Sequence, residues 1–156
     1  MKIVRTAAMD WQTALARGRF ENHRKDLGGD KMRAGLWQLP PGKRSFPLHQ
    51  HLATEEALFV VAGRAKVRTK GPEGEGEHEI GPGDYVSFPA GGVAHQLIND
   101  GTEPLVYLAM SAGVGIDLVE YPDSKKVAAA AGVGPGARRF VFPADSQVDY
   151  WHGEET

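Results

Sequence analysis

Short apolar segments alternate with polar turn residues from the middle of the chain onward. Most of these segments are rich in β-branched and aromatic residues, and one of them, at 65–69, alternates apolar with polar side chains. Both patterns are typical of strands, the second of a strand with one face in solvent. The sequence therefore predicts an all-β fold. The predicted strands lie at 58–61, 65–69, 85–88, 105–108, 116–121 and 139–142.

Glycine and proline separate the predicted strands. The chain holds 20 Gly and 10 Pro, spread along its length rather than gathered in one tract. Turn signals at intervals of about 8–12 residues are typical of β-sandwiches and barrels. The polar, glycine-rich stretch 71–79 is predicted as a solvated hairpin loop, and 132–137 as a second exposed loop.

One or two short helices are predicted beside the strands. Asp10 is a suitable N-cap for a helix over 11–17. Asp123 or Ser124 could cap a second helix over 125–131, which would end before a glycine. Both predictions rest on the preference of helix starts for Asp and Ser and of helix ends for Gly.

Length, charge and composition narrow the classes of protein. A chain of 156 residues fits a single domain over 1–156, with a barrel core at about 34–121 and terminal extensions packed on it. The formal net charge of −2 argues against a generic nucleic-acid partner. The absence of cysteine excludes disulfides, thiolate metal sites and cysteine nucleophiles. No apolar run approaches the ~20 residues of a membrane span, and no signal-peptide pattern is present. We therefore expect a cytoplasmic protein without a membrane partner.

His49 and His51 are the first candidates for chemistry among the six histidines. On a strand, residues i and i+2 project from the same face, so these imidazoles would lie side by side. Neutral imidazole is a ligand for Zn, Cu, Fe and Ni. Glu55 and Glu56 follow closely and would add a carboxylate. Strand alternation turns one of them inward, but both faces of the next segment are apolar, so alternation does not say which.

The spacing of these residues resembles the first motif of the cupin superfamily. That motif runs Gly, His-x-His, Glu, Gly, and its six-residue interval before the last glycine selects Glu56 rather than Glu55. The leading spacer is one residue longer than the usual five. The matching residues are Gly42, His49, His51, Glu56 and Gly63.

A second cupin-like motif follows at 83–99. It has one extra residue between Gly91 and His95, which Gly92 can absorb because glycine relaxes the backbone and loops tolerate insertion. The insertion affects the expected loop geometry rather than the role of His95. The matching residues are Gly83, Pro89, Gly91, His95 and Asn99.

The resemblance implies a double-stranded β-helix, the jelly-roll barrel of cupins, with short terminal extensions. It also implies that His49, His51, Glu56 and His95 converge in the barrel mouth on one divalent metal ion per chain. Zn is the first expectation, with Fe, Mn or Ni as alternatives, because the ligand set does not select the metal. Small cupins commonly pair, and exposed strand edges are usually covered, so a homodimer is expected, with residues 2–9 as one source of cover.

The resemblance leaves two functional classes open. The first is a metal-dependent enzyme of dioxygenase, isomerase or lyase type that acts on a small polar molecule, such as a sugar derivative or an oxo-acid. The second is a non-enzymatic binding or sensing protein whose metal anchors a small ligand. No motif identifies a catalytic residue. Six side chains are candidates for proton transfer or substrate binding, with barrel core or solvated strand as their alternative roles: Trp37, Gln38, Lys43, Arg44, Tyr85 and Tyr107.

Overall fold

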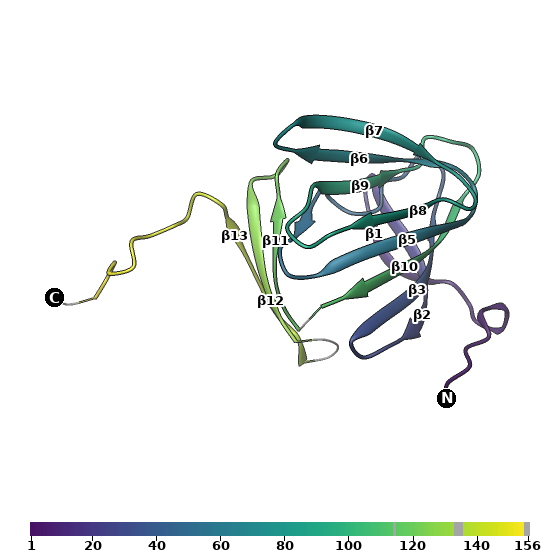
Figure 1. The fold of residues 1–156 in the computed structure, drawn as a ribbon, viewed down its shortest axis with the longest axis horizontal. Coiled ribbons are helices and arrows are strands. Elements are labelled where there is room, and N and C mark those ends of the chain that lie inside the picture. Colours follow the sequence, from purple (N-terminus) through teal and green to yellow (C-terminus); the bar gives the residue numbers. More distant parts are fainter. Residues whose placement is uncertain (114, 133–135, 155–156) are drawn as a thin grey trace.

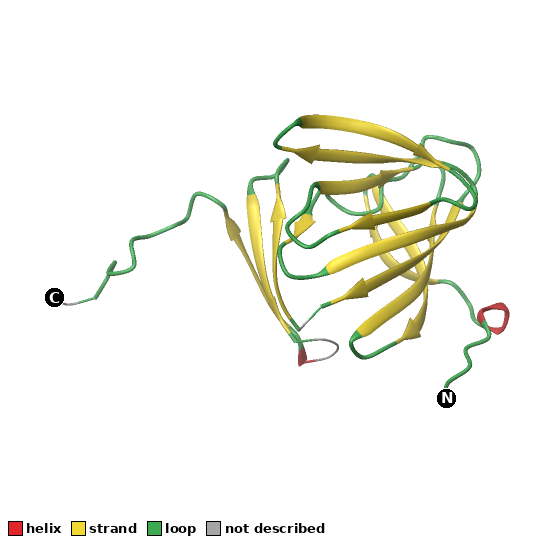
Figure 2. Ribbon diagram, in the orientation of Figure 1, coloured by secondary structure: helices red, strands yellow, loops and turns green. Residues whose placement is uncertain are grey.

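The structure is a computed structural model that describes residues 1–113, 115–132 and 136–154 (Figure 1). Almost all of its regular structure is strand, as Figure 2 shows, and one short 3₁₀ helix, η1 (Thr6–Ala8), precedes the first strand. The strands are β1 (Gln12–Arg17), β2 (Phe20–Gly28), β3 (Met32–Leu39), β4 (Gln50–His51), β5 (Glu55–Ala62), β6 (Ala65–Gly71), β7 (Gly74–Ile80), β8 (Tyr85–Phe88), β9 (Ala94–Ile98), β10 (Leu105–Ala112), β11 (Ile116–Tyr121), β12 (Lys126–Ala131) and β13 (Arg138–Pro143).

The strands form three antiparallel sheets. The largest has the order β1-β2-β3-β10-β5-β8, a second has the order β13-β12-β11-β4, and the third has the order β7-β6-β9. Neighbours along the chain are often not neighbours in a sheet, as where β10 lies between β3 and β5. This arrangement fits a double-stranded β-helix, and it confirms the all-β prediction (Figure 1).

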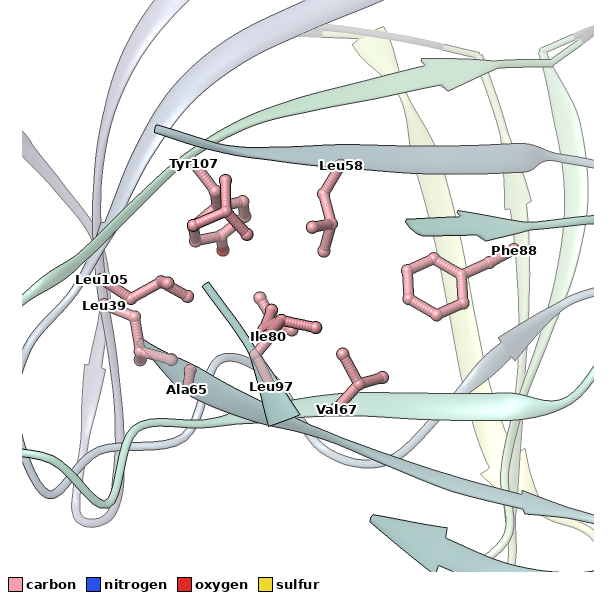
Figure 3. Close-up of a cluster of buried hydrophobic side chains, with 10 residues drawn as sticks. Leu39, Leu58, Ala65, Val67, Ile80, Phe88, Leu97, Leu105 and Tyr107 are labelled. Carbon is pink, nitrogen blue, oxygen red and sulfur yellow. The ribbon is translucent and has the colours of Figure 1, made fainter. Parts of the chain in front are cut away.

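Apolar side chains from the six-stranded and three-stranded sheets fill the barrel between them. Leu39, Val60 and Leu105 are fully buried. Figure 3 shows this cluster extending from Leu39 and Leu105 at one end to Phe88 at the other. Burial of a side chain of this size stabilises the fold by about 1.5–3 kcal/mol. The core is therefore continuous, and its Phe88 end lies beside the histidines described below.

Both predicted helices are wrong, because each segment pairs with a neighbouring strand. Residues 12–17 form β1, which pairs with β2 across a turn at Gly18, where φ is +59°. Residues 126–131 form β12, which lies between β11 and β13. Lys125, at the first position of the expected second helix, has φ +49°, a left-handed conformation that a right-handed helix does not accept. Local helix preference is thus outweighed by hydrogen bonding across the sheet.

The loop predicted over 71–79 is shorter than expected. Residues 74–80 form β7 and pair with β6, so the turn is confined to a few residues. Most side chains of β7 are exposed, as its polar sequence suggests. Part of the second predicted loop, 133–135, lies outside the described residues.

The two ends of the chain behave differently. Lys2 and Lys25 hold the N-terminal segment against β2, since the Lys2 Nζ donates to Leu27 O at 3.2 Å and the Lys25 Nζ donates to Thr6 O at 2.9 Å. After β13 the chain runs away from the sheets (Figure 1). Within the described ranges, no helix has the length and apolar character that a membrane span needs.

Candidate metal centre

The four expected ligands come from three segments of the barrel. His51 belongs to β4, and His49 lies two residues before it, so both project from the same face. His95 is in β9, and its backbone exchanges two hydrogen bonds with that of His49, at 2.8 and 3.2 Å. Glu56 is in β5 and faces the histidines, whereas the neighbouring Glu55 is exposed. The structure thus brings His49, His51, Glu56 and His95 together and resolves the choice that alternation left open.

The distances within this group suit a shared ion. The Glu56 Oε2 atom lies 3.9 Å from the His49 Nε2, 3.5 Å from the His51 Nε2 and 3.3 Å from the His95 Nε2. Two ligands bound at 2.0–2.2 Å to one metal lie roughly 2.8–3.6 Å apart when their bonds meet at 90–109°. Two of the three distances fall in that range. His49, His51 and Glu56 can hold a divalent metal, with His95 adjoining them through Glu56.

Hydrogen bonds fix which nitrogen of two rings faces the group. The His49 Nδ1 lies 2.8 Å from the carbonyl oxygen of Pro47. Since a carbonyl only accepts, His49 Nδ1 carries the proton and Nε2 presents a lone pair. The His51 Nδ1 likewise bonds the carboxylate of Asp117. Partners of this kind orient metal-binding imidazoles and raise their basicity.

His95 is held differently from the other two imidazoles. Its ring stacks on Phe88, with centroids 3.7 Å apart and planes inclined by 9°. Its buried Nδ1 has no hydrogen-bond partner among the described residues. Stacking on Phe88, together with the hydrogen bond between its Nε2 and Glu56, therefore sets the orientation of this ring.

The protonation states favour metal binding at neutral pH. Burial, reinforced by the charge of His95, lowers the pKa of His49 to about 4. Burial alone would raise the pKa of Glu56, but the His95 hydrogen bond and the charges of the three rings outweigh it, so the pKa lies below its ordinary value. A neutral imidazole and an ionised carboxylate are the forms that bind metals.

A cavity of about 680 Å³ opens onto this group. Of the six candidates for proton transfer or substrate binding, Trp37 and Tyr107 line it. Burial and the charge of Glu56 raise the pKa of Tyr107, so its hydroxyl stays protonated and is able to donate a hydrogen bond. The other four lie elsewhere. Tyr85 is exposed, Gln38 is outside the described lining, Lys43 pairs with Glu21 and Arg44 bonds Gln96.

Several residues in and around the site were not anticipated from the sequence. Asp117 orients His51, and Tyr121 stacks against the His49 ring with centroids 6.1 Å apart. Asp117 could have been noticed, because strand alternation places it on the same face as the buried Val119. The charged residues of the lining were also not anticipated: Arg24, Asp26, Arg33, Lys126 and Arg139.

Comparison with known proteins supports the fold. The family model of the cupin domain, Cupin_2, matches residues 35–111. A proposed sugar phosphate isomerase from Acidithiobacillus ferrooxidans is 28% identical over 92% of this chain and 91% of its own, with a TM-score of 0.78. No curated protein matches the sequence.

Two further solved structures share the fold at lower identity. A sugar phosphate isomerase of the cupin superfamily from Silicibacter pomeroyi is 21% identical over 93% of this chain and 94% of its own, with a TM-score of 0.77. KdgF from a Halomonas species is 21% identical over 73% of this chain and 96% of its own, with a TM-score of 0.59. At these identities the likeness concerns the fold alone. The motifs, the strand topology and the family match agree: residues 35–111 form a cupin domain.

Proposed function

We propose that this protein is a divalent-metal-dependent isomerase that acts on a small sugar phosphate. The observation that carries the proposal is the convergence of three imidazole Nε2 atoms on one carboxylate inside a cavity. The 28% identity with a proposed sugar phosphate isomerase, over nine tenths of both chains, supports this reaction class over dioxygenase or lyase chemistry. Zn²⁺ is the ion that we expect first in the isolated protein, because it ranks high in the affinity order for nitrogen and oxygen sites.

The residues around the metal centre have separable tasks in this proposal. His49, His51, Glu56 and His95 would hold the ion, which would act as a Lewis acid that polarises substrate oxygens. Asp117 keeps the His51 Nε2 aimed at the ion. Tyr107, buried and protonated, donates a hydrogen bond to a substrate oxygen in the cavity.

Isomerisation of a sugar phosphate requires few components at such a site. Conversion of an aldose to a ketose moves hydrogen between two neighbouring carbons and needs neither oxygen nor a second substrate. The apolar lining, including Leu58 and Phe88, keeps bulk water from the reacting carbons. A site of this kind requires two substrate oxygens beside the ion and a wall that holds the rest of the molecule.

The test is a solvent-exchange assay. Protein purified without an affinity tag is analysed for metals, then incubated with aldose phosphates in D₂O and followed by NMR. Conversion to the ketose, with deuterium entering the carbon next to the carbonyl, is the expected result. Chelation and the Glu56→Gln variant should each abolish it, and restoring the metal to chelated wild type should recover it.

The matched control is His78→Ala, which removes an exposed histidine of β7 outside the cavity. It should behave as wild type. Tight binding of a sugar phosphate without conversion or exchange, under every metal tested, would refute the isomerase and favour a binding protein. Conversion that persists at full rate in Glu56→Gln would refute the role of the metal centre.

A further inference from the structure

The floor of the cavity is a ladder of paired residues on β3, β10 and β5. Ser111 of β10 lies directly opposite Arg33 of β3 on one side and Glu56 of β5 on the other. Directly opposite residues in antiparallel strands project from the same face. Neighbouring strands are about 4.8 Å apart, so the backbones of Arg33 and Glu56 are separated by about 10 Å. A cation thus lines the same cavity as the metal centre, two strands away from it.

In the next row of the ladder, β3 and β10 carry small residues and β5 carries Leu58, so the row is open on the side of Arg33. Gly35 of β3 lies opposite Ala109 of β10. A Cβ atom at Gly35 would stand 2.8 Å from the Trp37 Nε1, so the edge of the indole that carries its N–H lies over this glycine. The indole N–H therefore lies over β3, one row along the ladder from Arg33, and Trp37 lines the same cavity.

The charge of this lining is opposite to that of the whole chain. Outside the metal centre the described lining carries four basic side chains and a single carboxylate, Asp26. Of the four, Arg24 is the one with a carboxylate of the described residues within 4 Å, at 3.8 Å from Asp26. The chain as a whole has a formal net charge of −2. The lining outside the metal centre is thus net positive in a chain that is net negative. The four are Arg24, Arg33, Lys126 and Arg139.

We propose that Arg33 and Ser111 form a subsite for the phosphate group of the substrate, assisted by Arg24 and the Trp37 indole N–H. The inference rests on the proposed function, which places the sugar oxygens at the metal centre. A guanidinium presents paired N–H donors that match phosphate oxygens. The Ser111 hydroxyl supplies one more donor in the same row as Glu56. The subsite sets specificity by requiring a dianion at the end of the molecule away from the metal.

Binding of matched ligands tests the subsite without turnover. Calorimetry measures the dissociation constants of D-ribose 5-phosphate, D-ribose and inorganic phosphate for the metal-loaded and the chelated protein. Wild type should bind the phosphate ester at least about tenfold more tightly than the free sugar. Arg33→Met should remove about tenfold or more of the affinity for the ester and for inorganic phosphate. It should change the affinity for D-ribose by less than about twofold. Ser111→Ala should cause a smaller loss of the same kind.

Arg138→Met is the control for net charge, since Arg138 precedes the lining residue Arg139 on β13 and is itself exposed and outside the lining. It should bind all three ligands as wild type does. Equal losses in Arg33→Met and Arg138→Met would overturn the subsite in favour of a general field effect. The subsite would also be overturned if the wild type bound the phosphate ester no more tightly than D-ribose. Inorganic phosphate binding by the chelated protein, lost in Arg33→Met, would uphold the subsite even where no isomerisation is seen.

Discussion

The strands of the cupin domain and the three strands that follow it contribute differently to the metal centre. Within residues 35–111 the barrel is closed by fully buried side chains such as Leu39, Val60 and Leu105. In β13, by contrast, every residue is exposed. The cupin domain supplies the four candidate metal ligands, whereas β11 supplies Asp117, which orients one of them. The candidate ligands and the residue that orients one of them therefore come from different regions of the chain, and these regions are not buried to the same extent.

The two regions are joined across the surface as well as through β4. Arg68 of β6 bonds Asp123, in the turn between β11 and β12, at 2.6 Å. It also bonds Glu75 of β7 at 2.8 Å. The Arg68 hydrogen bond holds the pKa of Asp123 below its ordinary value. The turn between β11 and β12 is thus linked to the barrel by surface contacts. We expect their loss to lower the free energy of unfolding slightly and to leave the fold intact.

The largest difference between the regions is expected in stability. Leu105→Ala should lower the free energy of unfolding by about 3 kcal/mol, within a range of 2–5, because it leaves a cavity at a fully buried position. Phe140→Ala, at an exposed position of β13, should change it by less than about 0.5 kcal/mol. Urea denaturation of both variants measures the difference. Equal losses would show that β13 shares the core of the barrel.

A second prediction concerns the pH dependence of the metal-free protein. The unfolded chain binds a proton at His49 below about pH 6.5, whereas the folded protein binds it only below about pH 4. The free energy of unfolding should therefore fall by up to about 3 kcal/mol as the pH drops through this window. Denaturation between pH 4 and 7, in the presence of chelator, measures the slope. His49→Gln should flatten it and His78→Ala should not, while a slope unaffected by His49→Gln would assign it to other groups.

The orienting role of β11 can be isolated with Asp117→Asn. The amide preserves shape but removes the charge that partners the His51 Nδ1, so metal affinity should fall by about 10–100-fold. The fold should be retained, because Asp117 lies outside the apolar cluster. Competition with a coloured chelator measures the affinity, and Asp145→Asn, at an exposed position beyond β13, is the control. An unchanged affinity in Asp117→Asn would confine the metal centre to the cupin domain.

The smallest effect is expected at the link between the regions. Arg68→Met should lower the free energy of unfolding by about 0.5–1 kcal/mol, because its partners Asp123 and Glu75 are exposed although the Arg68 side chain is mostly covered. The loss should diminish in about 1 M salt, where surface charges are screened. Thermal unfolding at low and high salt measures it. A salt-independent loss would point instead to packing of the arginine stem.

Much of the metal centre could be predicted from the sequence because its spacing is local. His49 and His51 share a face through simple alternation, and the interval before Gly63 distinguishes Glu56 from Glu55. The contribution of Asp117 depends on the pairing of β4 with β11, between residues 66 positions apart in the chain. No local pattern encodes that pairing. The same holds for Arg33, whose position relative to Glu56 follows from the order of β3, β10 and β5.

The wrong helices have a related cause. The alanine-rich run 128–131 favours a helix when it is considered alone. In the fold, Ala128 lies between Val119 and Val141 in the sheet and is fully buried. A larger side chain would not fit there as easily, so the alanines serve close packing. Local preference failed where small size was needed for contacts with distant strands.

The size of the cavity depends on the absence of a side chain at Gly35. A methyl group at this position would meet the indole edge of Trp37 at 2.8 Å, so the ring would have to shift from its place against the strand. Both residues line the cavity. Replacement of Gly35 by alanine would therefore reshape the chamber without altering any group that holds the metal. Homologous chains with a larger residue at the equivalent position would enclose a chamber of different size, and a designer could use the same position as a size filter.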